Sequence, residues 1–81
     1  MIDVPILYVE DEEDIREGVK ELLQRKFKQF YVADNGKTAL MLYLEHRPDI
    51  VITDINLPEL SGLELARQIK TINNETQIIF P

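Results

Sequence analysis

Short apolar runs alternate with amphipathic stretches along the whole chain, and this alternation restricts the possible folds more than any other feature. The runs expected to form strands cover residues 4–9, 30–34, 50–53 and 77–80. Helices are expected between them, over residues 14–27, 37–46 and about 62–72. Strands that alternate with helices predict right-handed crossovers and a parallel sheet with helices on both faces. We therefore expect one α/β domain with the order βαβαβαβ.

The helix boundaries rest on spacing and on end signals. The first helix carries apolar residues at the spacing of one helical face, with polar residues facing solvent between them. The apolar set is Ile15, Val19, Leu22, Leu23 and Phe27, and the polar set is Arg16, Glu17, Lys20, Glu21 and Gln24. Asn35 and Gly36 turn the chain into the second helix, which ends before Pro48. Ser61 and Glu64 form a capping box for the third helix.

Negative charge is concentrated near the start of the chain. The net charge is −6, and residues 1–14 contain six acidic residues (Asp3, Glu10, Asp11, Glu12, Glu13 and Asp14) and no Lys or Arg. Such a segment is a poor ligand for nucleic acid or anionic lipid but suits a cation. The chain has no cysteine and no apolar run long enough to span a bilayer. We expect a cytoplasmic protein without direct nucleic acid or membrane contacts.

Three acidic residues follow two of the predicted strands. Glu10 and Asp11 come after the first strand, and Asp54 comes after the third. Ligands of open α/β sheets bind at the carboxyl ends of the strands, so neighbouring first and third strands would bring these carboxylates together. Their repulsion favours a shared divalent cation, and oxygen ligands without His or Cys favour Mg²⁺. A carboxylate beside Mg²⁺ can also attack phosphorus and form an aspartyl phosphate.

Simpler roles for these acidic residues stay open. Glu12, Glu13 and Asp14 fit the start of a helix, where acidic side chains complement the helix dipole. Asp11 or Asp14 could act as the helix N-cap. Asp54 taken alone is compatible with an ordinary turn residue at a strand end. The occurrence of acidic residues after two strands that are expected to be neighbours favours a binding site.

Two segments carry a resemblance to a known family. "ILYVEDEEDIREGVKELL" and "DIVITDINLPELSGLELARQIK" resemble the receiver domain of two-component response regulators. The resemblance implies a flavodoxin-like sheet with strand order 2-1-3-4 for the strands present. It implies that Asp54 is the phosphoacceptor and that Glu10, Asp11, Asp54 and the backbone carbonyl of Asn56 bind Mg²⁺. Pro58 and Gly62 match positions that shape the loop after the third strand.

The resemblance also implies partners and an incomplete domain. A histidine kinase is the expected phosphoryl donor, and the chain itself is expected to be no enzyme beyond self-dephosphorylation. The family's fifth strand and last two helices, and the hydroxyl and lysine residues that contact the phosphoryl group, are expected to be absent from residues 1–81. We therefore expect compromised phosphorylation, and self-association through an exposed fourth strand or first helix.

Two other functions are compatible with parts of the sequence pattern. The first is a non-catalytic folding or dimerisation fragment of a receiver. The second is a phosphatase of the haloacid dehalogenase type, which also uses an aspartate nucleophile with Mg²⁺. That family requires a second acid two residues after the nucleophile, and this chain has Asn56 there.

Overall fold

Strands and helices alternate along the chain, as the sequence predicts. The computed structural model describes residues 1–81. Its elements are β1 (Ile6–Val9), α1 (Glu13–Leu23), β2 (Phe30–Ala33), α2 (Gly36–His46), β3 (Ile50–Thr53), α3 (Gly62–Ile72) and β4 (Gln77–Ile79). Each helix has 11 residues, and none is long and apolar enough to cross a membrane.

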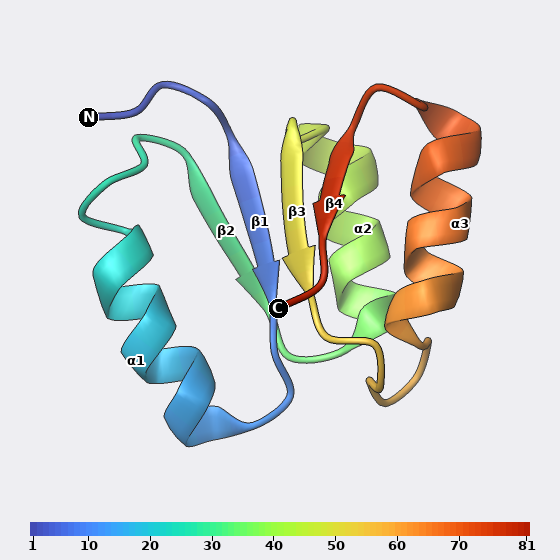
Figure 1. Ribbon diagram of the computed structural model, residues 1–81, viewed down its shortest axis with the longest axis horizontal. Helices are drawn as coiled ribbons and strands as arrows, with labels where there is room; N and C mark the ends of the chain where they lie inside the picture. Colours follow the sequence, from blue (N-terminus) through green and yellow to red (C-terminus); the bar gives the residue numbers. More distant parts are fainter.

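The four strands form one parallel sheet in the order β2-β1-β3-β4. This order confirms the predicted flavodoxin-like arrangement and makes β1 and β3 neighbours (Figure 1). Val9, the last residue of β1, pairs with Ala33 of β2 on one side and with Thr53 of β3 on the other. The residues that follow these strands therefore emerge at one level, at the carboxyl edge of the sheet.

Helices α2 and α3 cover one face of the sheet and α1 lies at the other (Figure 1). The core lies on the α2 and α3 side, where β-branched and other apolar strand residues pack against both helices. Its members are Leu7, Val9, Ala33, Ala39, Tyr43, Val51, Leu65 and Ile69. Because side chains alternate between the two faces of a strand, Ile6 and Tyr8 point toward the α1 side.

Helix α1 contains no buried residue, so its apolar stripe is only partly covered. Ile15 and Leu22 are 47% and 56% exposed, because α1 is the only helix at its face and little else packs against it. The helix also ends earlier than predicted. Phe27 forms an isolated bridge with Ile2 instead of a further helical turn. The expectation of an exposed apolar patch on the first helix is confirmed.

The helix ends follow capping chemistry in two of three cases. The Asn35 side chain accepts a hydrogen bond from the Thr38 amide at 2.8 Å at the start of α2. The Ser61 hydroxyl accepts from the Glu64 amide at 3.1 Å at the start of α3, as predicted. The N-cap of α1 is Glu12, without a side-chain capping bond, and not the predicted Asp11 or Asp14.

Candidate functional site

Three carboxylates meet at the carboxyl edge of the sheet. Glu10 follows β1 directly, Asp11 comes next, and Asp54 follows β3. One oxygen atom from each carboxylate can be chosen so that all three atoms lie within 4.8 Å of one another. The sequence therefore predicted the convergence of these residues correctly. It follows from the parallel pairing of β1 with β3, which puts Val9 opposite Thr53.

Glu10 is the most restrained member of this cluster. It is 8% exposed, and its amide donates to the Ala33 carbonyl oxygen at 3.1 Å. Its side-chain oxygen Oε2 accepts a hydrogen bond from the Glu12 amide at 3.1 Å. A buried carboxylate needs such partners, because an unpaired buried charge is costly.

Asp54 is half-buried at the end of β3. Its oxygen Oδ1 accepts a hydrogen bond from the Ile55 amide at 3.0 Å. No hydrogen bond engages Oδ2, so this oxygen is available to a cation or an electrophile. The Thr53 hydroxyl donates to the Asp54 carbonyl oxygen at 3.0 Å, which ties the backbone at the site to the buried end of the strand.

Two glycines hold the loop between β3 and α3 close to its neighbours. A Cβ atom at Gly62 would lie 1.8 Å from the Asp54 carbonyl oxygen, and the Gly62 amide donates to the Ile55 carbonyl at 2.7 Å. A Cβ atom at Gly36 would lie 1.8 Å from the Leu60 carbonyl oxygen. Only a residue without a side chain permits these approaches. The loop that carries Asp54 is therefore packed against the start of α2.

Arg16 of α1 contacts the backbone beside the acidic pair. Its Nη1 atom donates to the Glu10 carbonyl oxygen at 3.1 Å and to the Asp11 carbonyl oxygen at 3.4 Å. Its side chain is 17% exposed, so the expectation that Arg16 faces solvent is wrong. The sequence pattern placed it on the polar face of the helix and gave no signal for this contact.

Tyr8 lies beneath the cluster on β1, two residues before Glu10. It is 4% exposed, and burial is the main cause that raises the pKa of its hydroxyl group. The negative charges of Glu10 and Asp54 raise this pKa further, and the positive charge of Arg16 opposes them. The pKa of the Tyr8 hydroxyl group therefore depends on the charge of the acidic cluster.

A comparison with known families identifies the family of this chain. The family described as response regulator receiver domain matches residues 6–81. The chain belongs to this family. Its acidic cluster lies at the ends of the strands that the receiver resemblance singled out.

Other receivers and response regulators are similar over most of this chain. Transcriptional regulatory protein YdfI of Bacillus subtilis is 41% identical over 76 residues, covering 91% of this chain and 35% of that protein. Chemotaxis protein CheY of Bacillus subtilis is 37% identical over 75 residues, covering 91% of this chain and 62% of that protein. The chain therefore spans between about a third and two thirds of the length of these curated relatives.

Solved receiver structures support the same fold. A response regulator receiver domain protein from Clostridium thermocellum superposes with a TM-score of 0.87 at 31% identity. The superposition covers 95% of this chain and 63% of that chain. This chain and that receiver domain are therefore similar in both sequence and fold over nearly the whole of this chain.

The donor set of the receiver's cluster fits a hard divalent cation. It consists of carboxylate oxygens, without His or Cys, which favours Mg²⁺ over softer metals. Oxygens bound to one Mg²⁺ at about 2.0–2.1 Å lie up to about 4.2 Å apart. The 4.8 Å limit is compatible with a shared ion after small side-chain rotations or through water. Asn56 lies in the exposed loop two residues beyond Asp54, and the role of its carbonyl oxygen stays a prediction.

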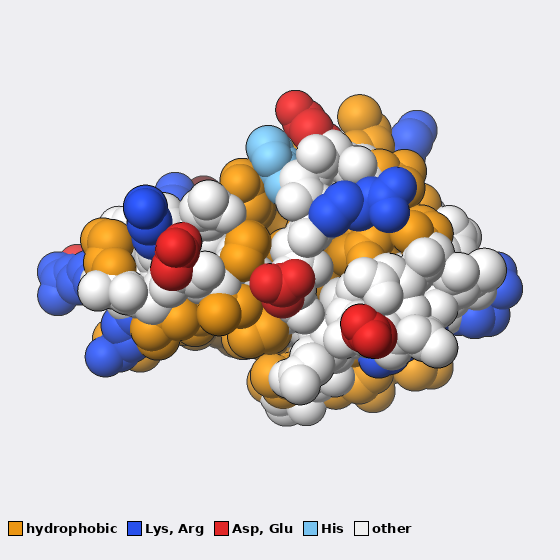
Figure 2. All heavy atoms as spheres, turned by 90° about the horizontal axis from the view of Figure 1, so that it is seen from above, with side chains coloured by type: hydrophobic (Ala, Val, Ile, Leu, Met, Phe, Trp, Pro, Cys, Tyr) orange, Lys and Arg blue, Asp and Glu red, His pale blue; other side chains and the backbone are white.

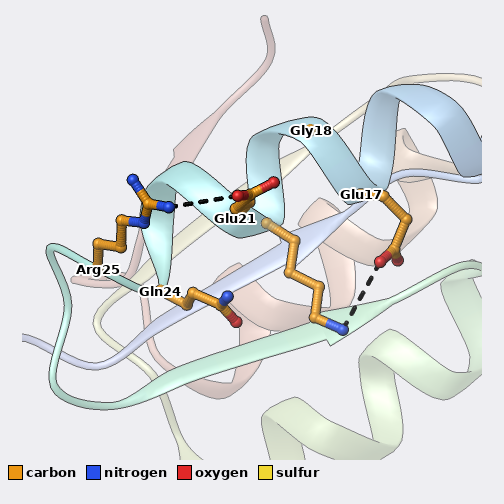
Figure 3. Close-up of a pocket in the computed structure, with 6 residues that line it drawn as sticks. Glu17, Gly18, Glu21, Gln24 and Arg25 are labelled. Atoms are coloured by element: carbon orange, nitrogen blue, oxygen red, sulfur yellow. Dashed lines mark hydrogen bonds and ion pairs between the residues drawn. The ribbon is translucent and has the colours of Figure 1, made fainter.

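No second group of three or more His, Asp or Glu side chains lies close enough together to share a metal ion. Figure 2 views the receiver from the amino ends of the strands, where acidic side chains appear as separate patches. The largest surface pocket, of about 430 Å³, lies on α1, and none of the three clustered carboxylates lines it. Figure 3 shows its charged lining, in which Arg25 pairs with Glu21 and Lys20 with Glu17. It lies beside Gly18, whose missing side chain leaves open space on the helix.

Proposed function

We propose that this receiver accepts a phosphoryl group on Asp54 from a histidine kinase, in a reaction that depends on Mg²⁺. The observation that carries the proposal is the approach of Glu10, Asp11 and Asp54 to within 4.8 Å. Three carboxylates so close repel one another unless a cation is present. The carboxylates of Glu10, Asp11 and Asp54 and the carbonyl oxygen of Asn56 would hold the ion.

The chain's own residues supply the nucleophile and its orientation. The Ile55 amide holds Oδ1 of Asp54, which leaves Oδ2 as the attacking oxygen. The new bond joins this oxygen to phosphorus, and the bond between phosphorus and the donor's leaving atom breaks. When bound, the cation supplies charge neutralisation for the carboxylates and for the phosphoryl oxygens. The chain is a phosphoryl acceptor in this proposal, and its one enzymatic activity would be self-dephosphorylation.

The test compares two Asp→Asn variants that remove the same charge. Asp54→Asn removes a proposed ligand, whereas Asp49→Asn changes an exposed residue at the opposite end of β3. Isothermal calorimetry with Mg²⁺ is expected to show binding to the unaltered chain and to the Asp49 variant. Binding to the Asp54 variant is expected to be weaker by at least about 10-fold, because even residues that only orient metal ligands contribute that much. Equal affinities in all three proteins would refute the metal site.

Phosphorylation is tested separately by mass spectrometry after incubation with acetyl phosphate. At most one phosphoryl group per chain is expected, in low yield and only when Mg²⁺ is present, and none is expected on the Asp54→Asn variant. Modification that persists in that variant would place the acceptor elsewhere.

A non-catalytic dimerisation role has its own support. Ile15 and Leu22 leave an apolar patch on α1, and Ile79 at the outer strand β4 is 46% exposed. Exposed apolar surface and unpaired strand edges both promote association. Light scattering over a concentration series tests this role. A dimer that also fails to bind Mg²⁺ would favour it over phosphoryl transfer, whereas a monomer would exclude it.

A further inference from the structure

The guanidinium group of Arg16 is the link between α1 and the backbone of the acidic cluster. Nη1 donates to two consecutive carbonyl oxygens, those of Glu10 and Asp11. Other charged side chains of the same helix are much more open to solvent. The exposed fractions are 17% for Arg16, 38% for Lys20 and 57% for Glu17. Arg16 thus differs from its neighbours on the helix in both contact and burial.

These two contacts hold the peptide groups on both sides of the Asp11 Cα atom, which carries the Asp11 side chain. Glu10 has further restraints, through its amide and its carboxylate. Asp11 is exposed and takes part in no hydrogen bond except the one that its carbonyl accepts from Arg16. Without the bond from Arg16, the backbone of Asp11 would be freer to move than that of Glu10, which keeps its other hydrogen bonds. Ligand atoms held in place before an ion binds reduce the entropy lost on binding.

We propose that Arg16 is a positioning residue, whose guanidinium holds the Glu10–Asp11 backbone so that the Asp11 carboxylate faces Glu10 and Asp54. The inference rests on the proposed function and deepens it, because it names a residue outside the ligand set on which Mg²⁺ affinity depends. Partners that orient metal ligands typically contribute about 10- to 100-fold in affinity.

A purely electrostatic role predicts the opposite sign. A positive charge near the cluster repels Mg²⁺, so removing only that charge would tighten binding. Loss of positioning weakens binding instead. The direction of the change therefore separates the two roles, and Lys20→Gln provides the matched control because it removes one positive charge from the same helix without a backbone contact to the acidic pair.

The experiment measures Mg²⁺ affinity by calorimetry for the unaltered chain, Arg16→Gln, Arg16→Lys and Lys20→Gln. We expect about 10-fold weaker binding for Arg16→Gln, partial recovery for Arg16→Lys, and a change below about twofold for Lys20→Gln. Lysine keeps the charge and a donor but lacks the planar fork of arginine. Unchanged or tighter binding by Arg16→Gln, or equal effects of Arg16→Gln and Lys20→Gln, would overturn the inference.

Amide hydrogen exchange without metal provides an independent measurement. The Glu12 amide donates to the Glu10 carboxylate, so a loosened backbone is expected to raise its exchange rate in Arg16→Gln. Far-ultraviolet circular dichroism verifies that the variant keeps its helices. If the unaltered chain binds no Mg²⁺, the proposed function fails, while faster exchange at Glu12 still supports positioning. Unaltered exchange at Glu12 in Arg16→Gln would contradict it.

Discussion

The two faces of the sheet differ in how much they bury. On the α2 and α3 side, Tyr43, Leu65 and Ile69 are completely inaccessible to solvent and form one core with the strands. On the α1 side, the helix contributes no buried residue. The carboxylates lie at the carboxyl edge of the sheet, beyond the ends of β1 and β3. The helices of one face therefore supply the core, and the candidate chemistry lies at the edge of the sheet.

The largest expected difference comes from one pair of leucines. Leu65→Ala in α3 empties a fully buried site and is expected to lower the free energy of unfolding by about 2–5 kcal/mol. Leu22→Ala in α1, at 56% exposure, is expected to change it by less than about 0.5 kcal/mol. Urea unfolding followed by circular dichroism measures both values. Similar losses in the two variants would show that α1 packs against the sheet more tightly than the 56% exposure of Leu22 indicates.

A pair of glycines makes a second comparison. Gly36→Ala puts a Cβ atom on the Leu60 backbone, and the resulting shift is expected to cost about 1–3 kcal/mol and to weaken Mg²⁺ binding. Gly18→Ala adds a methyl group in open space within α1 and is expected to stabilise the chain by about 0.5–1 kcal/mol. Thermal unfolding and calorimetry measure the two effects. A neutral Gly36→Ala would mean that the loop can move away without loss.

Two tyrosines test whether a buried hydrogen bond on the α2 and α3 side of the sheet stabilises the fold. The Tyr43 hydroxyl and the Thr76 hydroxyl share a buried hydrogen bond of 2.7 Å. Tyr43→Phe leaves Thr76 without this partner and is expected to cost about 1–2 kcal/mol. Tyr31→Phe is the control, because its half-buried ring stacks on His46 at 4.0 Å and its hydroxyl makes no hydrogen bond. Equal denaturation midpoints for the two variants would argue against a stabilising role of the Tyr43 hydroxyl.

The smallest expected effect lies on the outer surface of α3. Hydrogen bonds from Arg67 and then Gln68 lower the pKa of the Glu64 carboxyl group from 4.5 to about 2. Because the folded-state pKa is depressed, the associated stabilisation is present above pH 4.5 and is lost as the pH falls toward 2. Solvent screening keeps this contribution small, since Glu64 and Arg67 are exposed.

Carbonyl-detected NMR titration provides the measurement for Glu64. Its midpoint is expected at about pH 2 in the unaltered chain and closer to 4.5 in Arg67→Met. A midpoint that stays low in the variant would assign the shift to Gln68 or to the helix start.

The sequence predicted the parts of the structure that depend on local patterns and on topology. Apolar runs identified β1 and β3, and the pairing of Val9 with Thr53 then brought Glu10 and Asp54 together. Contacts that depend on one side-chain conformation were missed. Arg16 occupies a polar position of an amphipathic helix, and no periodicity shows that its guanidinium turns toward the strand end.

The environment of α1 was also only partly predictable. The spacing of Ile15 and Leu22 indicates an apolar stripe, but spacing says nothing about how much structure lies opposite it. The sequence predicts a turn at Gly36, but the close approach of Gly36 to the Leu60 backbone is visible only in the tertiary structure. The role of the Asn56 carbonyl stays a prediction.

The position of Tyr8 has a practical consequence for spectroscopy. The chain contains three tyrosines and no tryptophan, so its intrinsic ultraviolet emission comes from tyrosine alone. Tyr8 is buried directly beneath the carboxylates and feels the charges of Glu10 and Asp54. A cation that enters the cluster is expected to alter the emission of this ring, so the unlabelled protein carries its own optical reporter.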